Sequence, residues 1–378
     1  MPYLTDMFHD QNGSRRPAPD PAPATGFDRQ ALAARLGSAI LGQPAAVEAV
    51  VGAGGPPPRG GGGPPPPPPA GRGGGGPPRR GGRGPPRPPA AAADPHRPRA
   101  AILLVGPTGV GKTELVRQTA AALRSGPDDL CRIDMNALAQ EHYAASFTGA
   151  PPGYAGSKES LTLFDKATIE GDPYTPGLVL FDEIEKADAT VIRALLHVLD
   201  TGELRLANGK ERISFRNSFV FLTSNLGSAQ VARRLRGGPL RRWRGTDRAS
   251  THAIVRRAVE NFFDPEFFNR IDETIVLDPL DTDTAVRVAA LEIDRLAARL
   301  ARRGVRLRCD ATVAPALAAC GFDPVYGARG LRRHLRVFLA EPVADAILCH
   351  RTPGSEVTLC ARVVQGRVVV TAAGDVSG

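Results

Sequence analysis

Cysteine motifs, lysine and long apolar runs are scarce in this chain of 378 residues, and each scarcity excludes a class of protein. The 5 cysteines are scattered, with no Cys-x-x-Cys pair and no histidine at metal-ligand spacing. They therefore indicate reduced thiols in a core rather than a disulfide framework or a zinc site. No run of about 18 apolar residues could cross a membrane, and residues 1–20 lack the apolar core of a signal peptide. These absences predict a cytoplasmic protein with no membrane partner.

Lysine occurs at only five positions, so the formal net charge of +9 comes almost wholly from arginine. A basic balance can serve nucleic acid or another anionic surface. Much of the excess, however, lies in the N-terminal segment, a Pro/Gly tract and one loop, and no basic stripe is interleaved with aromatic residues. The charge pattern therefore counts against direct recognition of nucleic acid.

Glycine and proline are abundant and clustered, at 42 and 36 residues, so the foldable part of the chain is shorter than its length. Residues 1–26 are polar and Pro-rich, and residues 52–93 consist almost entirely of Gly, Pro, Arg and Ala. Neither segment has the apolar surface to offset the entropy of ordering, so both are predicted to be disordered, as is the tail 373–378. The Arg-Gly pieces of the insert could bind RNA weakly, but a tolerated low-complexity loop, or a local frame error, is the simpler explanation.

Between these segments the sequence predicts two domains with different patterns of secondary structure. Over residues 27–279, short apolar runs alternate with helical stretches, which is typical of an α/β domain with a parallel sheet flanked by helices. Over residues 280–372 the pattern is largely helical and ends in two strand-like runs, at 357–361 and 367–371. We therefore expect a smaller, mainly helical α+β domain at the C-terminal end.

The firmest functional signal is a glycine-rich loop that follows the apolar run Ile102–Val105 and precedes a helical stretch. Its residues are Gly106, Pro107, Thr108, Gly109, Val110, Gly111, Lys112 and Thr113. In this strand-loop-helix context the glycines let backbone N–H groups wrap phosphates, aided by the positive end of the helix. Lys112 is placed to reach the β- and γ-phosphates, and the Thr113 hydroxyl to bind Mg²⁺. The loop predicts ATP and Mg²⁺ as cofactors, and the flanking strand disfavours the alternative of a structural turn without nucleotide.

Polar side chains end two later apolar runs. Leu178–Phe181 is followed by Asp182 and Glu183, where Asp182 would hold the Mg²⁺ shell and Glu183 would polarise the attacking water. Because adjacent strand residues face opposite ways, the two carboxylates cannot share one task. Asn225 follows the run at 218–223 and can hydrogen-bond that water or the γ-phosphate. For each motif taken alone, solvated acids and a simple strand-to-loop cap are the alternatives.

Several longer motifs, in order along residues 27–372, resemble the second ATPase module of Clp-type AAA+ unfoldases and disaggregases. They are Gly149–Gly156 (GAPPGYAG), Phe181–Ala187 (FDEIEKA), Thr223–Ser228 (TSNLGS), Asp264–Glu273 (DPEFFNRIDE) and Gly321–Arg329 (GFDPVYGAR). The resemblance implies an AAA+ P-loop NTPase that hydrolyses ATP to ADP and phosphate. It also implies that residues 280–372 are the family's C-terminal small domain, or lid.

The resemblance assigns roles to residues of the first domain. Ile40 and Leu41 match the segment that lines the adenine pocket, and Asn225 matches sensor 1. Tyr154, which stands between glycines, matches the first pore loop, where an aromatic side chain can grip an extended polypeptide without regard to its sequence. An ordinary turn tyrosine is the alternative there.

Two arginines match positions that act on the phosphates of the family's nucleotide. Arg270 matches the arginine finger, which reaches the ATP of a neighbouring subunit, and Arg329 matches sensor 2 in the lid. Cations aimed at a transferring phosphoryl group suit the charge that develops there. The alternatives are a local salt bridge from Arg270 to Asp272 or Glu273, and a surface charge at Arg329.

By resemblance, we expect a homo-oligomeric ring, a hexamer, that threads or remodels substrate proteins through a central pore. The alternative is an ATP-dependent assembly module that recruits partners without unfolding them. The sequence has no substrate-recruiting N-terminal domain, first ATPase module or middle-domain coiled coil, and the insert 52–93 replaces a mostly helical segment. At 233–243, where protease-linked relatives carry a docking tripeptide, the chain is rich in arginine, which counts against pairing with a proteolytic barrel.

Overall fold

The computed structural model describes residues 29–53, 94, 96–139, 163–205, 212–236, 248–323, 327–350 and 356–372. The predicted leader, the tail, most of the insert and Tyr154 lie outside these residues. Among the helices that are described, none combines the length and the apolar character needed to span a membrane.

Two short helices precede the insert: α1 (Arg29–Ala39) and α2 (Pro44–Ala53). The turn between them contains Gly42 with φ 78°, a left-handed value that favours glycine. The insert begins later than its composition predicts, because Gly52 and Ala53 complete α2. Ala53 remains helical because it packs against an apolar core of the first domain.

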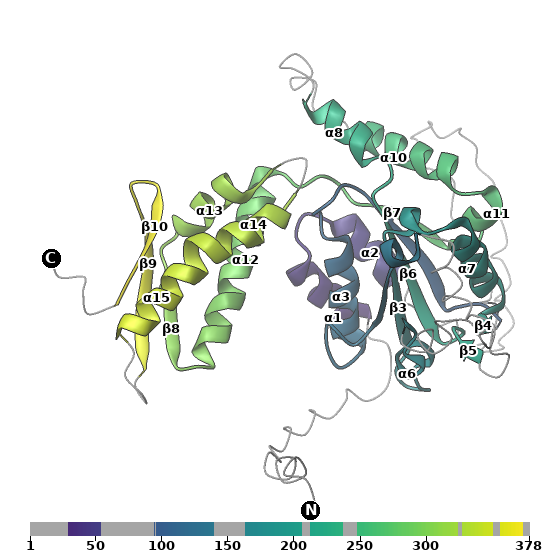
Figure 1. Cartoon of the computed structure of the whole chain (residues 1–378), viewed down its shortest axis with the longest axis horizontal. Coiled ribbons are helices and arrows are strands. Elements are labelled where there is room, and N and C mark those ends of the chain that lie inside the picture. Colours follow the sequence, from purple (N-terminus) through teal and green to yellow (C-terminus); the bar gives the residue numbers. More distant parts are fainter. Residues whose placement is uncertain are drawn as a thin grey trace, which may run out of the picture.

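A five-stranded parallel sheet forms the centre of the first domain, in the order β2-β3-β6-β1-β7 (Figure 1). Its strands are β1 (Ala100–Val105), β2 (Cys131–Asp134), β3 (Gly177–Asp182), β6 (Ser218–Ser224) and β7 (Glu273–Val276). Every residue of β1, β3 and β6 is buried, as expected for central parallel strands that are covered on both faces. The predicted fold class of this domain is confirmed.

Helices cover both faces of the sheet and create two apolar cores (Figure 1). On one face, α1, α2 and α3 (Lys112–Leu123) pack against side chains that include Leu104 of β1. On the other, α7 (Ala189–Thr201) and α10 (Arg248–Phe262) pack against side chains that include the adjacent Leu103, because successive strand residues face opposite ways. The shorter elements of this domain are η1 (Met135–Leu138), α6 (Lys166–Glu170), η2 (Ile184–Lys186), β4 (Glu203–Arg205), β5 (Arg212–Ser214), α8 (Ser228–Arg236) and α11 (Pro265–Phe268).

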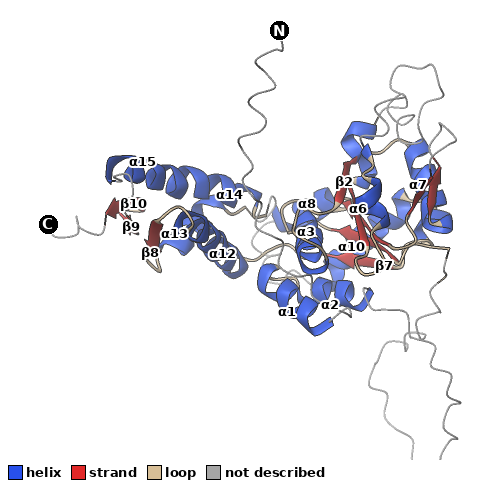
Figure 2. Ribbon diagram, turned by 90° about the horizontal axis from the view of Figure 1, so that it is seen from below, coloured by secondary structure: helices blue, strands red, loops and turns tan. Residues whose placement is uncertain are grey.

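A smaller, mainly helical domain follows, with a three-stranded sheet at the end remote from the first domain (Figures 1 and 2). Its helices are α12 (Thr282–Ala301), α13 (Val313–Gly321), α14 (Arg329–Leu335), the π-helix η3 (Arg336–Ala340) and α15 (Glu341–His350). Its strands are β8 (Val305–Cys309), β9 (Val357–Val364) and β10 (Arg367–Ala372). Strand β9 pairs parallel with β8 and antiparallel with β10, and one face of the sheet packs on α12 and α15. The predicted α+β domain is confirmed, although the sequence prediction lacks β8.

The carboxyl ends of the parallel strands meet at one edge of the five-stranded sheet. Val105 at the end of β1 is in register with Ser224 of β6, and Asp134 of β2 is in register with Asp182 of β3. The polar segments that follow these strands therefore gather in one place. Open parallel sheets bind their ligands at this edge.

Candidate functional site

A cavity of about 590 Å³ lies at the carboxyl edge of the parallel sheet. Its walls are the glycine-rich loop, the turn between α1 and α2, the ends of β2, β3 and β6, and parts of α12 and α14. The predicted site residues that line it are Ile40, Leu41, Thr108, Gly109, Val110, Gly111, Lys112, Thr113, Asp182, Glu183, Asn225 and Arg329. Most of the residues selected from the sequence are therefore brought together, and both domains contribute to the cavity.

The glycine-rich loop turns sharply from β1 into α3. Gly109 has φ 77° and Gly111 has φ 105°, values that residues with a side chain rarely adopt. Gly111 precedes α3 without a side-chain cap, so the first N–H groups of this 12-residue helix are free to bind an anion beside the cavity. The loop thus fits the phosphates of a nucleotide.

Lys112 is folded back onto this loop. Its Nζ donates to the carbonyl oxygens of Gly106 (2.7 Å) and Pro107 (2.8 Å) and to Oδ1 of Asn225 (2.8 Å). Burial lowers the pKa of Lys112 from 10.5 to about 8, although nearby carboxylates, Glu185 foremost, act in the opposite direction. A buried ammonium that is held by neutral acceptors would gain by exchanging them for phosphate oxygens.

Asp182 accepts hydrogen bonds on both of its carboxylate oxygens. Oδ1 accepts from Oγ1 of Thr223 (2.5 Å) and of Thr113 (3.4 Å). Oδ2 accepts from Nε (3.1 Å) and Nη2 (2.5 Å) of Arg132, a residue that sequence reasoning did not select. A hydroxyl beside a carboxylate is the hard oxygen donor set that Mg²⁺ prefers, so Thr113 and Asp182 fit the predicted ion.

Glu183 has a backbone conformation that is rare for residues other than glycine, with φ 59° and ψ 54°. Asn136 Nδ2 donates to its Oε2 (2.9 Å), and Asn225 Nδ2 donates to its Oε1 (3.3 Å). Its backbone N–H donates to Thr223 Oγ1 (3.0 Å). The two amides fix a carboxylate at the cavity wall, which is what a group that polarises a water requires. Sequence reasoning missed Asn136, although a polar residue two positions beyond β2 at this sheet edge could have been found.

An apolar wall closes the end of the cavity beside the first two helices. It consists of Ile40, Leu41, Leu280, Val288 and Leu291. Gln43 fixes the turn behind it, since its Nε2 donates to the carbonyl oxygen of Asp278 (2.8 Å) and its Oε1 accepts from the N–H of Asp278 (3.1 Å). A mostly apolar wall of this kind suits the planar base of a nucleotide.

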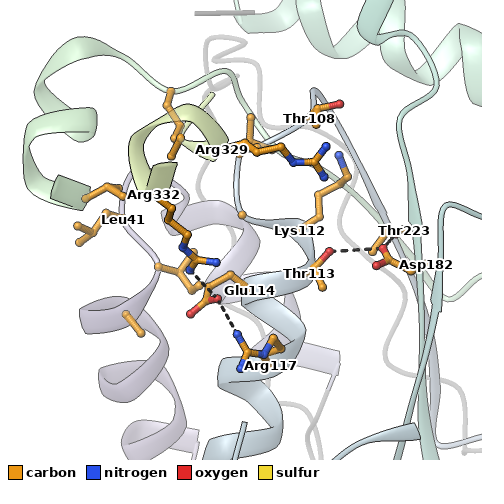
Figure 3. Close-up of a pocket in the computed structure, with 18 of the residues that line it drawn as sticks. Leu41, Thr108, Lys112, Thr113, Glu114, Arg117, Asp182, Thr223, Arg329 and Arg332 are labelled. Carbon is orange, nitrogen blue, oxygen red and sulfur yellow. Dashed lines mark hydrogen bonds and ion pairs between the residues drawn. The ribbon is translucent and has the colours of Figure 1, made fainter. Parts of the chain in front are cut away.

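The second domain contacts the glycine-rich loop directly. The N–H of Ala328 donates to the carbonyl oxygen of Gly109 (3.0 Å), and the preceding Gly327 has φ 61°. Arg329 opens α14, and its guanidinium points toward Lys112 (Figure 3). Within the described part of the chain Arg329 has no hydrogen-bond or ion-pair partner. Its charge is therefore available to an anion in the cavity.

Charged residues of both domains meet at the start of α3. Glu114 lies 3.3 Å from Arg332 of α14 (Figure 3). It also lies 3.3 Å from Arg295 of α12. Arg332 also pairs with Glu292 of α12 (3.1 Å). Burial alone would raise the pKa of Glu114, but a hydrogen bond from Gln118 and the charges of the two arginines outweigh it and lower that pKa. Ion pairs thus tie the orientation of the second domain to the loop-bearing helix.

Arg270, alone among the predicted site residues described, lies away from the cavity and its loop. It follows α11, and its Nε donates to Oδ1 of Asp200 near the end of α7 (2.7 Å). Its own carbonyl oxygen accepts from Nη2 of Arg97 (2.8 Å), and Arg97 in turn pairs with Asp272 (3.7 Å). The guanidinium of Arg270 is thus held at a site separate from the chain's own cavity.

Two family models match the chain in succession. The model described as an AAA domain (Cdc48 subfamily) matches residues 97–274, and the C-terminal, D2-small domain of ClpB protein matches residues 280–359. The boundary between the two matches coincides with the passage from the parallel sheet to the mainly helical domain.

Curated relatives match over different shares of their length. An "ATP-dependent protease ATP-binding subunit-like protein" of Rhodococcus erythropolis is 56% identical over 98% of this chain and 99% of its own. A Pseudomonas aeruginosa protein of the same description, AmiB, is 45% identical over 69% of this chain and 72% of its own. The chaperone protein ClpB of Pseudomonas putida is 39% identical over 70% of this chain, but only 30% of ClpB is covered.

One solved structure with the same fold is a closed-state reconstruction of Hsp104 with ATPγS and FITC-casein. It superposes with a TM-score of 0.67 over 91% of this chain and 51% of its own. At 24% sequence identity this likeness concerns the fold alone.

Proposed function

Because the chain belongs to the Clp-type AAA+ family of ATPases, we propose that it forms hexameric rings that hydrolyse ATP between subunits and unfold or remodel proteins. Polypeptide would be threaded through the central pore of the ring. ATP hydrolysis itself follows from the family; the ring, its substrates and the residue roles below are the proposal.

In this proposal, each cavity holds one ATP. Ile40 and Leu41 contact the adenine, the N–H groups of the glycine-rich loop hold the phosphates, and Lys112 leaves its carbonyl partners for the β- and γ-phosphates. Thr113 and Asp182 hold Mg²⁺, which when bound neutralises charge on the phosphate oxygens. The donor chemistry and the distances described above support these assignments.

Hydrolysis is assigned to groups at the phosphate end of the cavity. Glu183 polarises the attacking water, and Asn225 orients both Glu183 and that water. Arg329 contributes positive charge from the second domain, so closure of that domain onto the loop completes the chain's own half of the site. The guanidinium of Arg329, which has no hydrogen-bond or ion-pair partner among the described residues, and the amide contacts of Glu183 support these roles.

The position of Arg270 carries the proposal that a neighbouring subunit completes the site. An arginine that stabilises phosphoryl transfer must reach the γ-phosphate, yet Arg270 is paired with Asp200 away from its own cavity. Arg270 can act on a γ-phosphate if it reaches into the cavity of an adjacent copy of the chain. Hydrolysis would then depend on assembly, as a ring motor requires.

Action on polypeptides rests on the relatives and on Tyr154. The relatives are named as chaperones or as ATP-dependent protease ATP-binding subunit-like proteins, and the Hsp104 structure was determined with casein. Tyr154 stands in a glycine-bracketed segment that suits a mobile grip on an extended chain.

The test is ATP-driven unfolding of a fluorescent model substrate that carries a disordered tag. We expect loss of fluorescence with ATP, no loss with ADP, and no loss for the hydrolysis-deficient Glu183→Gln variant. If the wild-type chain assembles and hydrolyses ATP without unfolding any tagged substrate, it acts instead as an assembly module that recruits partners.

A further inference from the structure

Arg132 is a cation in contact with the proposed magnesium ligand. Its guanidinium donates twice to Oδ2 of Asp182, through Nε and Nη2, at 3.1 and 2.5 Å. The side chain of Asp182 is 11% exposed, whereas that of Arg132 is 54% exposed. A half-exposed cation therefore covers one face of an almost buried carboxylate.

Asp182 needs such a partner when no nucleotide is bound. It lies in a cluster of carboxylates, since Lys112 experiences the charges of Asp182, Glu183 and Glu185 together. Lys112 itself does not pair with Asp182, because all three of its Nζ contacts go to two loop carbonyls and Asn225. Of the residues the structure describes, Arg132 is the one cation in an ion pair with Asp182.

The geometry makes this contact the one that a metal ion would replace. Oδ1 of Asp182 is held by Thr223, which is 1% exposed and cannot easily move away. The Thr113 hydroxyl can donate to Asp182 while its lone pairs remain free for a metal ion. Oδ2 has its acceptor capacity filled by the two N–H groups of Arg132. A cation with its water shell that engages this carboxylate must displace the half-exposed guanidinium.

We propose that Arg132 is a positioning residue that occupies Asp182 in the empty site and leaves it when the magnesium-bound nucleotide enters. This inference rests on the magnesium-holding role proposed above for Asp182. It predicts that Arg132 competes with Mg²⁺ but not with the nucleotide. The empty cavity keeps its carboxylate ordered, and the apparent affinity for Mg²⁺ is lowered by the cost of breaking the ion pair.

The experiment is a Mg²⁺ titration of fluorescent ADP binding to the full chain, performed for wild type, Arg132→Gln and Arg132→Lys. For Arg132→Gln we expect the half-saturating Mg²⁺ concentration to fall by up to about fivefold, which is the upper end of what an exposed ion pair contributes. ADP affinity in excess EDTA should be unchanged. Arg132→Lys keeps the charge but loses the forked contact, so its half-saturating Mg²⁺ concentration should lie between those of wild type and Arg132→Gln.

Stability provides a second readout. Thermal unfolding without nucleotide should occur at a lower temperature for Arg132→Gln, and saturating Mg²⁺ and ADP should abolish the difference. Arg216→Gln is the matched control, because Arg216 is 41% exposed and pairs with Glu203 away from the cavity. It should leave the Mg²⁺ dependence unchanged.

Three results would overturn the proposal. An unchanged half-saturating Mg²⁺ concentration in both Arg132 variants would show that Arg132 does not compete with the ion. A rise in that concentration would mean that Arg132 helps to hold it, and weaker ADP binding in EDTA would make Arg132 a phosphate contact. All are binding measurements, so failure of the unfolding assay would leave this inference standing.

Discussion

The buried Lys112 makes nucleotide binding dependent on pH in an unusual range. Burial lowers the pKa of Lys112 from 10.5 to about 8, because a buried ammonium loses its hydration. Phosphate oxygens in the cavity would favour the charged form and raise that pKa again. Binding of ADP should therefore take up a proton wherever free Lys112 is partly neutral.

The size of the pH effect on ADP binding follows from the pKa shift of Lys112. At pH 9 only about one tenth of Lys112 is protonated in the free protein, so ADP should bind about tenfold more weakly than at pH 7. In the folded protein without nucleotide, burial of this charge costs about 3 kcal/mol, since each pKa unit is 1.36 kcal/mol. That cost is fully present below pH 8 and disappears as pH rises toward 10.5, because the unfolded chain binds the extra proton in that interval.

Calorimetric titration in two buffers of different ionisation enthalpy measures the ADP affinity and the number of protons taken up on binding. We expect a nearly constant ADP affinity from pH 7 to 7.5, a loss of about half of it by pH 8, a decline that approaches one decade per pH unit above pH 9, and uptake of about half a proton at pH 8. Lys112→Arg is the matched control, because a guanidinium stays charged throughout this range. Its affinity, whatever its absolute value, should be flat with pH.

A flat profile for the wild-type chain between pH 7 and 9, with no proton uptake, would refute the reasoning. It would mean that Lys112 remains fully charged in the empty site, and that its contacts to the loop carbonyls compensate for burial. Circular dichroism at each pH checks that the fold persists, so that loss of affinity is not loss of structure.

Two further substitutions test the cavity and its lid. Glu183→Gln should bind ATP within about twofold of wild type but turn it over about 10²- to 10⁴-fold more slowly, as measured by phosphate release; normal turnover would remove Glu183 from its role. Gly327→Ala should weaken ADP binding about tenfold, because its Cβ would lie 2.6 Å from the carbonyl oxygen of Gly109 and push the second domain off the loop. Gly304→Ala is its control, since Gly304 has a similar φ of 75° but no atom within 4 Å, and should lower stability without changing affinity.

The sequence predicted the fold and the centre of the cavity because both depend on local signals. Buried parallel strands appear as continuous apolar runs, and residues that end them must gather at one edge of the sheet. Lys112, Asp182, Glu183 and Asn225 were selected on this basis and line one cavity. Strand β8 was missed because its charged residues conceal a short alternation, Val-Arg-Leu-Arg-Cys, that has only one buried face.

The supporting side chains could not be predicted because their contacts depend on tertiary register. Asn136 and Arg132 reach Glu183 and Asp182 only because β2 lies beside β3 with Asp134 opposite Asp182. For Arg270 the alternative to the arginine finger was likewise a salt bridge to its sequence neighbours, whereas the structure pairs it with a residue 70 positions away. Local pattern identifies which residues carry the chemistry, and packing decides what holds them.

The central claim is that a neighbouring subunit completes each ATP site, and mixing two variants tests it most directly. Glu183→Gln removes the group that polarises the water but keeps Arg270, whereas Arg270→Ala keeps an intact cavity but lacks the arginine. Each variant alone should be nearly inactive. In an equal mixture, about a quarter of the interfaces would pair an intact cavity with an intact arginine, so ATPase activity should rise well above the sum of the two. Activity that stays at that sum, although the subunits co-assemble, would contradict the account.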